Sequence, residues 1–302
     1  MDKKILGVDW GTSNRRAYLV DQHGACLAEH EDGLGMLAVG GREHFSGALA
    51  GLLETMNVGG EVPVIMSGMV GSASGWQEVP YLDSSVPLTE LPAHLAPVAD
   101  AGWAGRCHIV PGYCHRDGGA VDVMRGEETQ LLGAVALGHR DGWLVLPGTH
   151  SKWVLLRDGL IQSMSTYMTG ELFAMLSAGG TLSSMMGGDA SDVEGYAIGL
   201  AQARRNEPLS NTLFRVRAGV VSRSAPAAQA PAVVSGLLIG AEFAAATRAL
   251  EASGGAANIT VIGSPALAVR YAVAADHFGL RCDVLDPHRV YCTAISQFFL
   301  QA

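Results

Sequence analysis

The order of apolar and polar positions along the chain predicts short strands followed by helices. Short apolar runs near the start are separated by Gly, Thr, Ser, Asn and Asp, which is typical of a meander of three strands. After the meander and up to residue 137, the apolar residues have helical spacing, except in one continuous apolar run that ends on Gly68 and predicts a buried strand. The predicted strands are 5–8, 17–20, 25–28 and 62–68, and the predicted helices are 45–56 and 127–137.

The same order of elements recurs in the second part of the chain. Three apolar runs are again separated first by a Gly-Thr-Ser-type turn and then by an Asp-Gly turn. The predicted strands here are 143–146, 152–156, 160–162 and 259–262, and helices are expected at 170–176, 233–250 and after Pro265. Two weakly similar halves indicate two like-folded α/β domains, 1–138 and 139–302, with a cleft between them.

The composition is that of a globular protein and argues against some kinds of partner. The chain has 302 residues, of which 48% are hydrophobic and 16% charged, as in a well-buried globular protein. A net charge of −9 argues against a nucleic-acid or anionic-membrane surface as partner. The uncharged run 224–241 reaches the length of a membrane span, but Pro226 and Pro231 indicate a loop that enters a core helix.

Five cysteines without a C-x-x-C motif are typical of reduced thiols in a reducing compartment. No secretory pattern opens the sequence, so a cytoplasmic location is expected. Cys107-His108 and Cys114-His115 do not have the spacing of a tetrahedral zinc site. The composition leaves a homodimer open.

The first hairpin carries candidate phosphate chemistry. Asp9 ends the first strand, and Gly11, Thr12 and Ser13 form the turn that follows it. Glycine lets backbone N–H groups approach phosphate oxygens, and hydroxyl groups donate further hydrogen bonds. Asp9 can hold Mg²⁺, usually through water, because that ion gives up its hydration shell reluctantly. An ordinary hairpin with a turn-forming Asn is the alternative interpretation.

The second hairpin has a similar turn, made by Gly148 and Thr149. His150 and Lys152 add positive charge, which an acidic protein must gather locally in order to bind phosphate. A structural histidine is the alternative for His150. No G-x-x-x-x-G-K-[ST] motif is present, which excludes the P-loop class.

Five motifs and a short extension resemble the 2-dehydro-3-deoxygalactonokinase family. They are D-W-G-T-S-x-x-R-A, S-G-M-x-G-S-x-x-G-W, R-G-E-E-T-Q, L-P-G-T-H-S-K-W and G-L-L-I-G-A-E, extended by Gly263-Ser264-Pro265. The resemblance implies ATP-dependent phosphorylation of the terminal (C6) hydroxyl of a 2-keto-3-deoxy sugar acid in galactonate catabolism. It also implies two ribonuclease-H-like domains of the actin/hexokinase/Hsp70 type, with ATP and Mg²⁺ in the cleft.

The resemblance also assigns binding residues. The loop that follows the strand ending on Gly68 looks like the sugar-acid pocket, to which we assign Trp10, Gly68, Met69 and Trp76. Gly236, Gly240 and Gly263 look like glycines on the adenosine side. Gly236 and Gly240 stand one helical turn apart, so a close helix-packing face is an equally good interpretation of that pair.

A carboxylate is needed to orient the acceptor hydroxyl and to take its proton. Similar sugar kinases use an Asp at the start of the corresponding helix, and related exopolyphosphatases use a Glu of a G-x-E-E-type turn. Here Glu127 and Glu128 stand at that place, and we assign the base to Glu128, with Glu127 as the second candidate. The alternative is that acidic residues in the first turn complement the helix dipole, by about 0.3–1 kcal/mol each.

Arginine is the expected ligand of the substrate carboxylate, because its planar guanidinium binds a carboxylate with two hydrogen bonds. Arg15 and Arg16 are neighbours on a strand and therefore point to opposite faces. The family pattern places its arginine directly before alanine, which is Arg16, and a solvated strand arginine is expected at Arg15. Arg125 is a second candidate for the carboxylate.

Two other functions use the same fold. A polyphosphate- or nucleotide-phosphatase is favoured by the Glu-Glu turn and disfavoured by the aromatic loop at Trp76. A non-catalytic nucleotide switch is disfavoured because two domains nearly use up the chain. A kinase for the gluconate epimer stays open as well, because the sequence does not define the stereochemistry preferred at C4.

Overall fold

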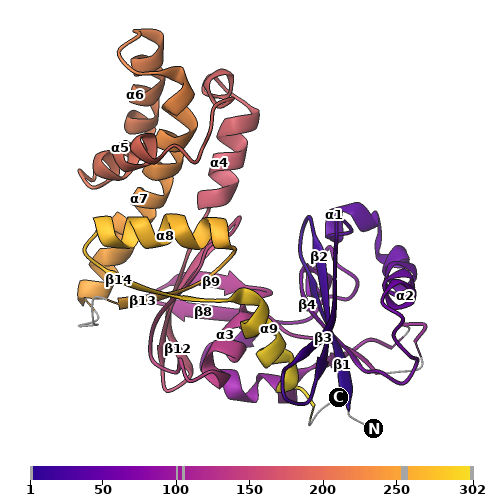
Figure 1. Cartoon of the computed structure of the whole chain (residues 1–302). Helices are drawn as coiled ribbons and strands as arrows, with labels where there is room; N and C mark the ends of the chain where they lie inside the picture. The colour runs from indigo at the N-terminus through magenta and orange to yellow at the C-terminus, as the bar shows by residue number, and fades with distance from the viewer. Residues whose placement is uncertain (1–2, 100, 104–105, 253–257, 300–302) are drawn as a thin grey trace. The chain divides into compact units, whose positions relative to one another are not determined.

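The computed structural model describes residues 3–99, 101–103, 106–252 and 258–299 (Figure 1). The described residues form two compact units, which are treated separately below. The first unit takes its residues from Met1–Asp141, Val154–Met164 and Asp286–Ala302, and the second from Gly142–Trp153 and Ser165–Leu285. The units therefore interleave along the chain, whereas a division after residue 138 would make them consecutive.

A six-stranded sheet forms the centre of the first unit, in the order β3–β2–β1–β4–β7–β6. Its strands are β1 (Lys4–Trp10), β2 (Arg15–Asp21), β3 (Cys26–Asp32), β4 (Val64–Gly68), β6 (Ala96–Pro97) and β7 (Cys107–Ile109). The predicted meander is confirmed, since β2 is antiparallel to both β1 and β3. β4 runs parallel to β1 and β7 parallel to β4, so the sheet continues through crossover connections.

A second sheet has the order β12–β11–β10–β13–β14 and repeats the order of the first five strands of the first sheet. Its strands are β10 (Gly142–Leu146), β11 (Ser151–Arg157), β12 (Leu160–Tyr167), β13 (Asn258–Ile262) and β14 (Arg281–Leu285). β13 is parallel to β10 and to β14. Three strands in sequence followed by two parallel strands, found twice, confirm the expected pair of ribonuclease-H-like folds.

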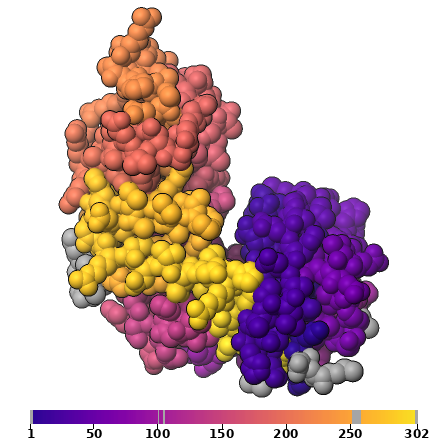
Figure 2. Space-filling model, in the orientation of Figure 1, coloured from indigo at the N-terminus to yellow at the C-terminus, as the bar shows by residue number. Residues whose placement is uncertain are grey.

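The core of the first unit lies between the six-stranded sheet and α2 (Phe45–Thr55), which α1 (Met36–Val39) precedes. The buried side chains of α2 are Phe45, Leu49, Leu52 and Leu53, at the spacing of one helical face. They pack on alternate residues of β1, as a period of two requires. Figure 2 shows this first part of the chain, in indigo, as a continuous packed surface on the face in view.

Two further helices complete the first unit, α3 (Glu127–Ala136) and α9 (Pro287–Ser296), together with a small sheet in the order β5–β8–β9. The strands of that sheet are β5 (Leu82–Asp83), β8 (Tyr113–Asp117) and β9 (Ala120–Met124). α9 packs on α3, and a Cβ added at Gly133 would lie 2.0 Å from the carbonyl oxygen of Val290. Glycine at this position therefore brings the last helix of the chain against the helix that begins with Glu127.

The second unit contains five helices. They are α4 (Thr169–Ala178), α5 (Val193–Ala203), α6 (Leu209–Val221), α7 (Ala230–Ala252) and α8 (Pro265–His277). The segment Ala227–Leu250 has the length and mean hydropathy (1.5) of a membrane span, yet 78% of that window is buried inside the protein. Burial of this kind is typical of a core helix, as the sequence predicted.

Candidate functional site

In the first unit, the ends of two parallel strands lie beside the start of a helix. β1 and β4 pair so that Asp9 lies opposite Ser67 and Trp10 opposite Gly68. α3 begins close by, because a Cβ added at Gly126 would lie 3.2 Å from the Cα of Gly68. The fold therefore brings Asp9 close to the Glu127-Glu128 pair, and the carboxyl end of parallel strands is where α/β folds place their ligands.

Two glycines permit this close approach. Gly68 has φ +87°, and a Cβ there would lie 2.8 Å from the carbonyl oxygen of Trp10 and 3.4 Å from Oδ1 of Asp9. Gly126 has φ +116°, a backbone conformation that other residues adopt only with strain. A side chain at either position would separate the strand ends from α3.

The Asp9 carboxyl is partly buried, and burial is the main reason why its pKa is raised to about 6. The negative charges of Glu127 and Glu31 raise this pKa further, whereas the Arg16 guanidinium lowers it. Glu127 is thus close enough for its charge to be felt at Asp9. Two neighbouring carboxylates repel each other, and a divalent cation with oxygen ligands relieves that repulsion. The donor set at Asp9 therefore fits Mg²⁺.

The two glutamates at the start of α3 have different environments. Glu128 is 0% exposed, its Oε2 accepts from the Gly126 N–H at 2.6 Å and its Oε1 accepts from the Thr129 hydroxyl at 3.3 Å. Burial, with the charge of Glu127 next, raises the pKa of Glu128 to about 8. Full burial keeps this carboxyl out of contact with a substrate in this structure, and the raised pKa favours its protonated form. The geometry therefore disfavours our first assignment of the base, Glu128.

Glu127 is partly exposed, and its Oε2 accepts from the Arg125 N–H at 3.1 Å. Its charge acts on both Asp9 and Glu128, so it lies near both carboxyls. Of the two glutamates it is the one with exposed surface. The geometry thus favours the second candidate, and the sequence could not make this distinction because both residues share the first helical turn.

Arg15 and Arg16 point to opposite faces, as strand geometry requires, but the environment of Arg15 is not the one expected. Arg15 is 2% exposed, forms an ion pair with Asp32 and lies over the Trp10 ring at 5.0 Å. The prediction of a solvated Arg15 is therefore wrong, because this guanidinium binds into the core beneath the sheet. Arg16 lies opposite Asp9 in the sheet and pairs with Glu31 at 2.9 Å, with 45% of its side chain exposed.

Trp10 does not line a binding pocket. Its side chain is fully buried, its ring packs on Phe45 with centroids 5.0 Å apart, and its N–H donates to the Leu34 carbonyl at 2.9 Å. Its assignment to substrate binding is wrong, because the side chain after Asp9 points to the opposite face of β1 and enters the core. Trp76 is partly exposed and stacks on the same Phe45 ring at 6.0 Å.

Arg125 lies against the loop that follows β4. Its Nη2 donates to the Val79 carbonyl at 2.7 Å, and its guanidinium lies 4.2 Å from the centre of the Tyr81 ring. A Cβ added at Gly71 would lie 2.9 Å from Nη1 of Arg125. Within the part of the chain that the structure describes, Nε and Nη1 of this arginine have no hydrogen-bond partner. The structure thus brings Arg125 to the loop assigned to the sugar acid, where Met69 is partly exposed.

The first hairpin turn is exposed, and backbone hydrogen bonds fix its conformation. Thr12 and Ser13 are exposed and Gly11 is partly exposed. The Gly11 N–H donates to the Asn14 carbonyl at 2.9 Å, and the Gly11 and Thr12 carbonyls accept from Met36 and Leu37 at the start of α1. These bonds shape the turn while its hydroxyl side chains stay exposed to solvent.

In the second unit, Gly148, Thr149 and His150 are exposed on the corresponding turn. The His150 ring pairs with the Glu171 carboxylate at 2.5 Å. Lys152 is only 5% exposed, and its ammonium donates to the Thr166 hydroxyl at 3.0 Å. The predicted phosphate contact of Lys152 therefore conflicts with its position, because β11 is buried on both faces from Ser151 to Leu156.

The sequence missed a buried hydrogen-bond network around Glu242 in the second unit. Its Oε1 accepts from Ser151 at 2.7 Å and Trp153 at 2.6 Å. Its Oε2 accepts from Thr169 at 2.5 Å and Tyr271 at 2.9 Å. Burial raises the pKa of Glu242, and these four donors oppose that rise. The last letter of the G-L-L-I-G-A-E motif is the signal that could have identified this residue.

Gly236 and Gly240 belong to a helix crossing. A Cβ at Gly236 would lie 2.2 Å from the Tyr196 carbonyl oxygen, and one at Gly240 would lie 2.6 Å from Cβ of Ala203. Both glycines are buried against α5, which favours the helix-packing alternative over the assignment to the adenosine side. Gly263 is partly exposed, lies before α8 and would place a Cβ 2.8 Å from the Pro147 ring.

Another residue that the sequence did not indicate is Tyr291 on α9. Its phenol oxygen lies 3.0 Å from Oγ of Ser67, the strand partner of Asp9, and both groups are buried. Burial and the Asp9 charge raise the pKa of Tyr291 well above its ordinary value. The last helix of the chain therefore supports the end of β4 beside the candidate site.

Comparison with known proteins gives consistent matches over almost the whole chain. A family model described as 2-keto-3-deoxy-galactonokinase matches residues 9–298. The 2-dehydro-3-deoxygalactonokinase of Escherichia coli (strain K12) is 34% identical over 284 residues, covering 94% of this chain and 92% of that protein. A protein of Rhizobium meliloti (strain 1021), named probable 2-dehydro-3-deoxygalactonokinase DgoK1, is 38% identical over 288 residues, with coverages of 92% and 91%.

Solved structures agree with these matches. A Sinorhizobium meliloti protein provisionally assigned as a 2-dehydro-3-deoxygalactonokinase superposes with a TM-score of 0.88 at 34% identity, covering 97% of this chain and 94% of that chain. The inorganic polyphosphate/ATP-glucomannokinase of Arthrobacter sp. strain KM gives a TM-score of 0.50 at 14% identity, with full coverage of both chains. The second likeness supports the fold alone.

Proposed function

The chain belongs to the 2-keto-3-deoxy-galactonokinase family, and on that premise we propose that it transfers the γ-phosphoryl group of ATP to the C6 hydroxyl of 2-dehydro-3-deoxygalactonate. The family match over residues 9–298 is the observation that carries this proposal. The curated relatives are named as kinases of the galactonate compound, which gives no support to a phosphatase or to preference for the gluconate epimer. The protein is therefore a phosphotransferase that consumes ATP.

The two hairpin turns are the proposed phosphate ligands. The Thr12 and Ser13 hydroxyls of the first unit and the Gly148-Thr149 turn of the second unit are exposed, as contact with a bound nucleotide requires. His150 is an exposed ring on the second turn, and it already pairs with the Glu171 carboxylate in the structure. Both turns supply backbone N–H groups and hydroxyls rather than a single strong ligand, so substitution of one hydroxyl should weaken ATP binding only partly.

Asp9 is the proposed holder of Mg²⁺, through water or directly. When bound, Mg²⁺ neutralises charge on the phosphate oxygens. Asp9 lies at the end of β1, where the charge of Glu127 also acts on it, so negative charge gathers where a cation would be held. The raised pKa of Asp9 means that a cation is needed to keep this carboxyl ionised below about pH 6.

Glu127 is the proposed general base. Its carboxylate orients the C6 hydroxyl and accepts its proton as the bond from O6 to the γ-phosphorus forms and the bond from that phosphorus to the β,γ-bridging oxygen breaks. ADP leaves with the electron pair of the broken bond. Glu128, protonated and buried beneath it, holds the Gly126 N–H and so sets the first turn of α3.

Arg125 is the proposed ligand of the substrate carboxylate. Two of its nitrogens are buried without a partner among the described residues, and Nη1 lies beside Gly71 in the loop that follows β4. Arg16 is the alternative, but Glu31 already pairs with it. A bidentate arginine at this place explains preference for a sugar acid over a neutral sugar.

We also propose that the enzyme acts in the cytoplasm, where ATP is available and its five free cysteines stay reduced. A homodimer stays open, and no surface of the described residues is assigned to it. Nucleic acid and membrane lipid are not proposed as partners, since the net charge is −9.

The experiment that tests the proposed function is a coupled ADP-release assay over a small panel of acceptors. We expect turnover with 2-dehydro-3-deoxygalactonate, less with the C4 epimer, and little ATP hydrolysis without an acceptor. Phosphate release at the same rate with no acceptor present would refute the kinase proposal and favour the phosphatase. A higher kcat/KM for the gluconate epimer would refute the substrate assignment alone.

A further inference from the structure

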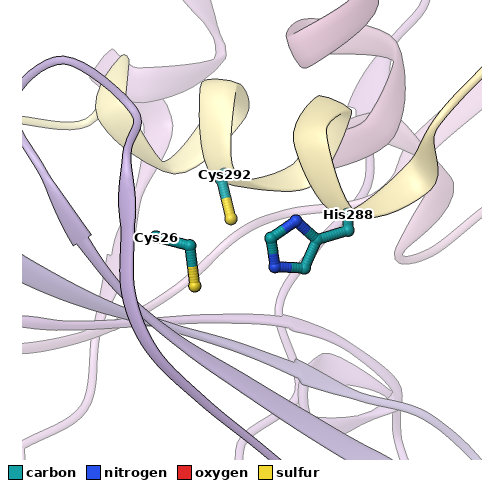
Figure 3. Close-up of side chains that lie close together, drawn as sticks. All are labelled: Cys26, His288 and Cys292. Atoms are coloured by element: carbon teal, nitrogen blue, oxygen red, sulfur yellow. The ribbon is translucent and has the colours of Figure 1, made fainter.

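Two thiols and one imidazole converge in the first unit, away from the candidate site. Figure 3 shows Cys26, on β3, facing His288 and Cys292, on α9. The Sγ atoms of the two cysteines and a ring nitrogen of His288 all lie within 4.8 Å of one another. These residues come from opposite ends of the chain, and the fold alone brings them together.

The packing of α9 positions His288 and Cys292. These residues are four apart and therefore share one face of the helix. The Tyr18 ring on β2 packs edge-on against the His288 ring at 5.0 Å and lies tilted against the Tyr291 ring at 5.3 Å. Asp286 caps the helix by accepting from the His288 N–H at 3.0 Å. Contacts of the helix thus place two of the three ligands.

Cys26 is positioned by the sheet. It pairs with Val20 across an irregularity in the β2–β3 register, at the first residue of β3. Its thiol is partly buried and donates to the Ala28 carbonyl at 3.4 Å, and the Cys292 thiol is buried. Partial burial protects such a site from solvent, while Cys26 and His288 leave it open to an entering ion.

The chemistry of this donor set selects a borderline-soft divalent cation. Thiolate and imidazole ligands suit Zn²⁺, whereas Mg²⁺ requires oxygen ligands. At bond lengths of about 2.3 Å to sulfur and about 2.0–2.1 Å to nitrogen, ligand atoms around one zinc ion stand roughly 3.5–3.8 Å apart. Ligand atoms within 4.8 Å reach that spacing by small side-chain rotations.

A fourth ligand is also close. An Oε2 atom of Glu29, on the same strand as Cys26, lies 3.1 Å from Nε2 of His288. This carboxylate can bind the ion or can hold the imidazole ring from its far side, as carboxylates commonly do at zinc sites. Water completes the coordination in the second arrangement.

We propose that Cys26, His288 and Cys292 form a binding site for a thiophilic divalent cation, with Zn²⁺ as the expected ion. The site joins the last helix of the chain to an edge strand of the sheet of the first unit. α9 also carries Tyr291, which contacts Ser67 beside Asp9. Bound zinc is therefore expected to stabilise the first unit, and this inference does not depend on the proposed kinase activity.

The test is a metal titration of the full-length protein, first stripped with a chelator and kept under a phosphine reductant. We expect about one equivalent of Zn²⁺ to bind, and Co²⁺ in its place to give a thiolate-to-cobalt absorption band. Cys26→Ser and Cys292→Ser should each weaken Zn²⁺ binding at least tenfold and lower the intensity of that band. Cys282→Ser, which alters a partly exposed cysteine outside the cluster, is the matched control and should bind as the wild type does.

Thermal unfolding provides an independent measurement. Zn²⁺ should raise the Tm of the wild type and of Cys282→Ser but not that of Cys26→Ser or Cys292→Ser, whose circular dichroism is checked first. A Co²⁺ spectrum without a thiolate band in the wild type would overturn the proposal, since the ion would then sit on oxygen ligands. Equal Zn²⁺ affinity in all variants would overturn it as well.

Discussion

Replacement of Glu128 by Gln tests whether burial raises the pKa of the Glu128 carboxyl, which is the neighbour of the candidate base Glu127. Glu128 is fully buried, and its pKa is raised from 4.5 to about 8. A carboxyl whose pKa is higher in the folded state stabilises the protein fully below its unfolded pKa and loses that contribution as pH rises through the folded pKa. The wild type should therefore lose stability between pH 4.5 and pH 8, because the folded state then has to bury an ionised Glu128.

The size of the effect follows from these two pKa values. Between pH 5 and pH 8 the contribution of Glu128 to the free energy of unfolding should fall by about 3–4 kcal/mol, at 1.36 kcal/mol per pKa unit. Gln has the same shape, can accept from the Gly126 N–H and does not ionise. Glu128→Gln should therefore be destabilising or neutral at pH 5 and more stable than the wild type at pH 8.

The assay is urea unfolding followed by tryptophan fluorescence at several pH values, since three of the five tryptophans (Trp10, Trp76 and Trp103) lie in the first unit. The midpoint difference between variant and wild type should change by on the order of 1 M urea over this pH range. Glu54→Gln, an exposed glutamate on α2, is the control and should leave the pH dependence unchanged. Parallel pH profiles for the wild type and Glu128→Gln would refute the inference that Glu128 is buried and protonated.

Four further predictions concern catalysis and packing. Asp9→Ala should lose metal-dependent turnover, by orders of magnitude in kcat, while its circular dichroism stays that of the wild type; near-normal turnover would contradict the Mg²⁺ assignment. Glu127→Gln should lower kcat by about 10²–10⁴-fold with a small effect on ATP binding, and a larger loss in Glu128→Gln would reverse the assignment of the base. Gly236→Ala should destabilise the second unit by about 2 kcal/mol or more in thermal unfolding, because a Cβ there lies 2.2 Å from the Tyr196 carbonyl; an unchanged Tm would show that α5 and α7 do not cross so closely. Glu242→Gln should cost about 1–3 kcal/mol in urea unfolding, since its NH₂ group must face two donors whichever way it turns, and a neutral result would show that these donors find other acceptors.

The candidate site could be predicted only in part, and the reason differs from residue to residue. Asp9 and the Glu127-Glu128 turn were found because phosphoryl transfer needs carboxylates at the end of a strand and at the start of a helix. The choice between Glu127 and Glu128 could not be made, since both lie in one helical turn and only the packing of α3 buries the second. Lys152 looked like a phosphate ligand by its charge, yet β11 is buried on both faces and Lys152 is buried with it.

Strand alternation explains the errors at Trp10 and Arg15. Alternation with a period of two places neighbouring residues on opposite faces of a strand, but it does not show which face the core covers. The core of α2 covers the face of Trp10 and Arg15, which leaves Asp9 and Arg16 on the other. The role of Gly236 and Gly240 was ambiguous for a related reason. Glycine permits close approach to the backbone, and the sequence does not show whether a ligand or another helix is the group that approaches.

The sequence by itself determined the local elements, the repeat of two like-ordered sheets and the family. These properties depend on the period of apolar residues, on turn-forming residues and on short motifs, all of which are local in the chain. Only the tertiary structure decided which side chains are buried, which glutamate can be reached and that Cys26 faces Cys292. Those properties depend on contacts between segments far apart in sequence, and the burial that results also sets the pKa values of Asp9 and Glu128.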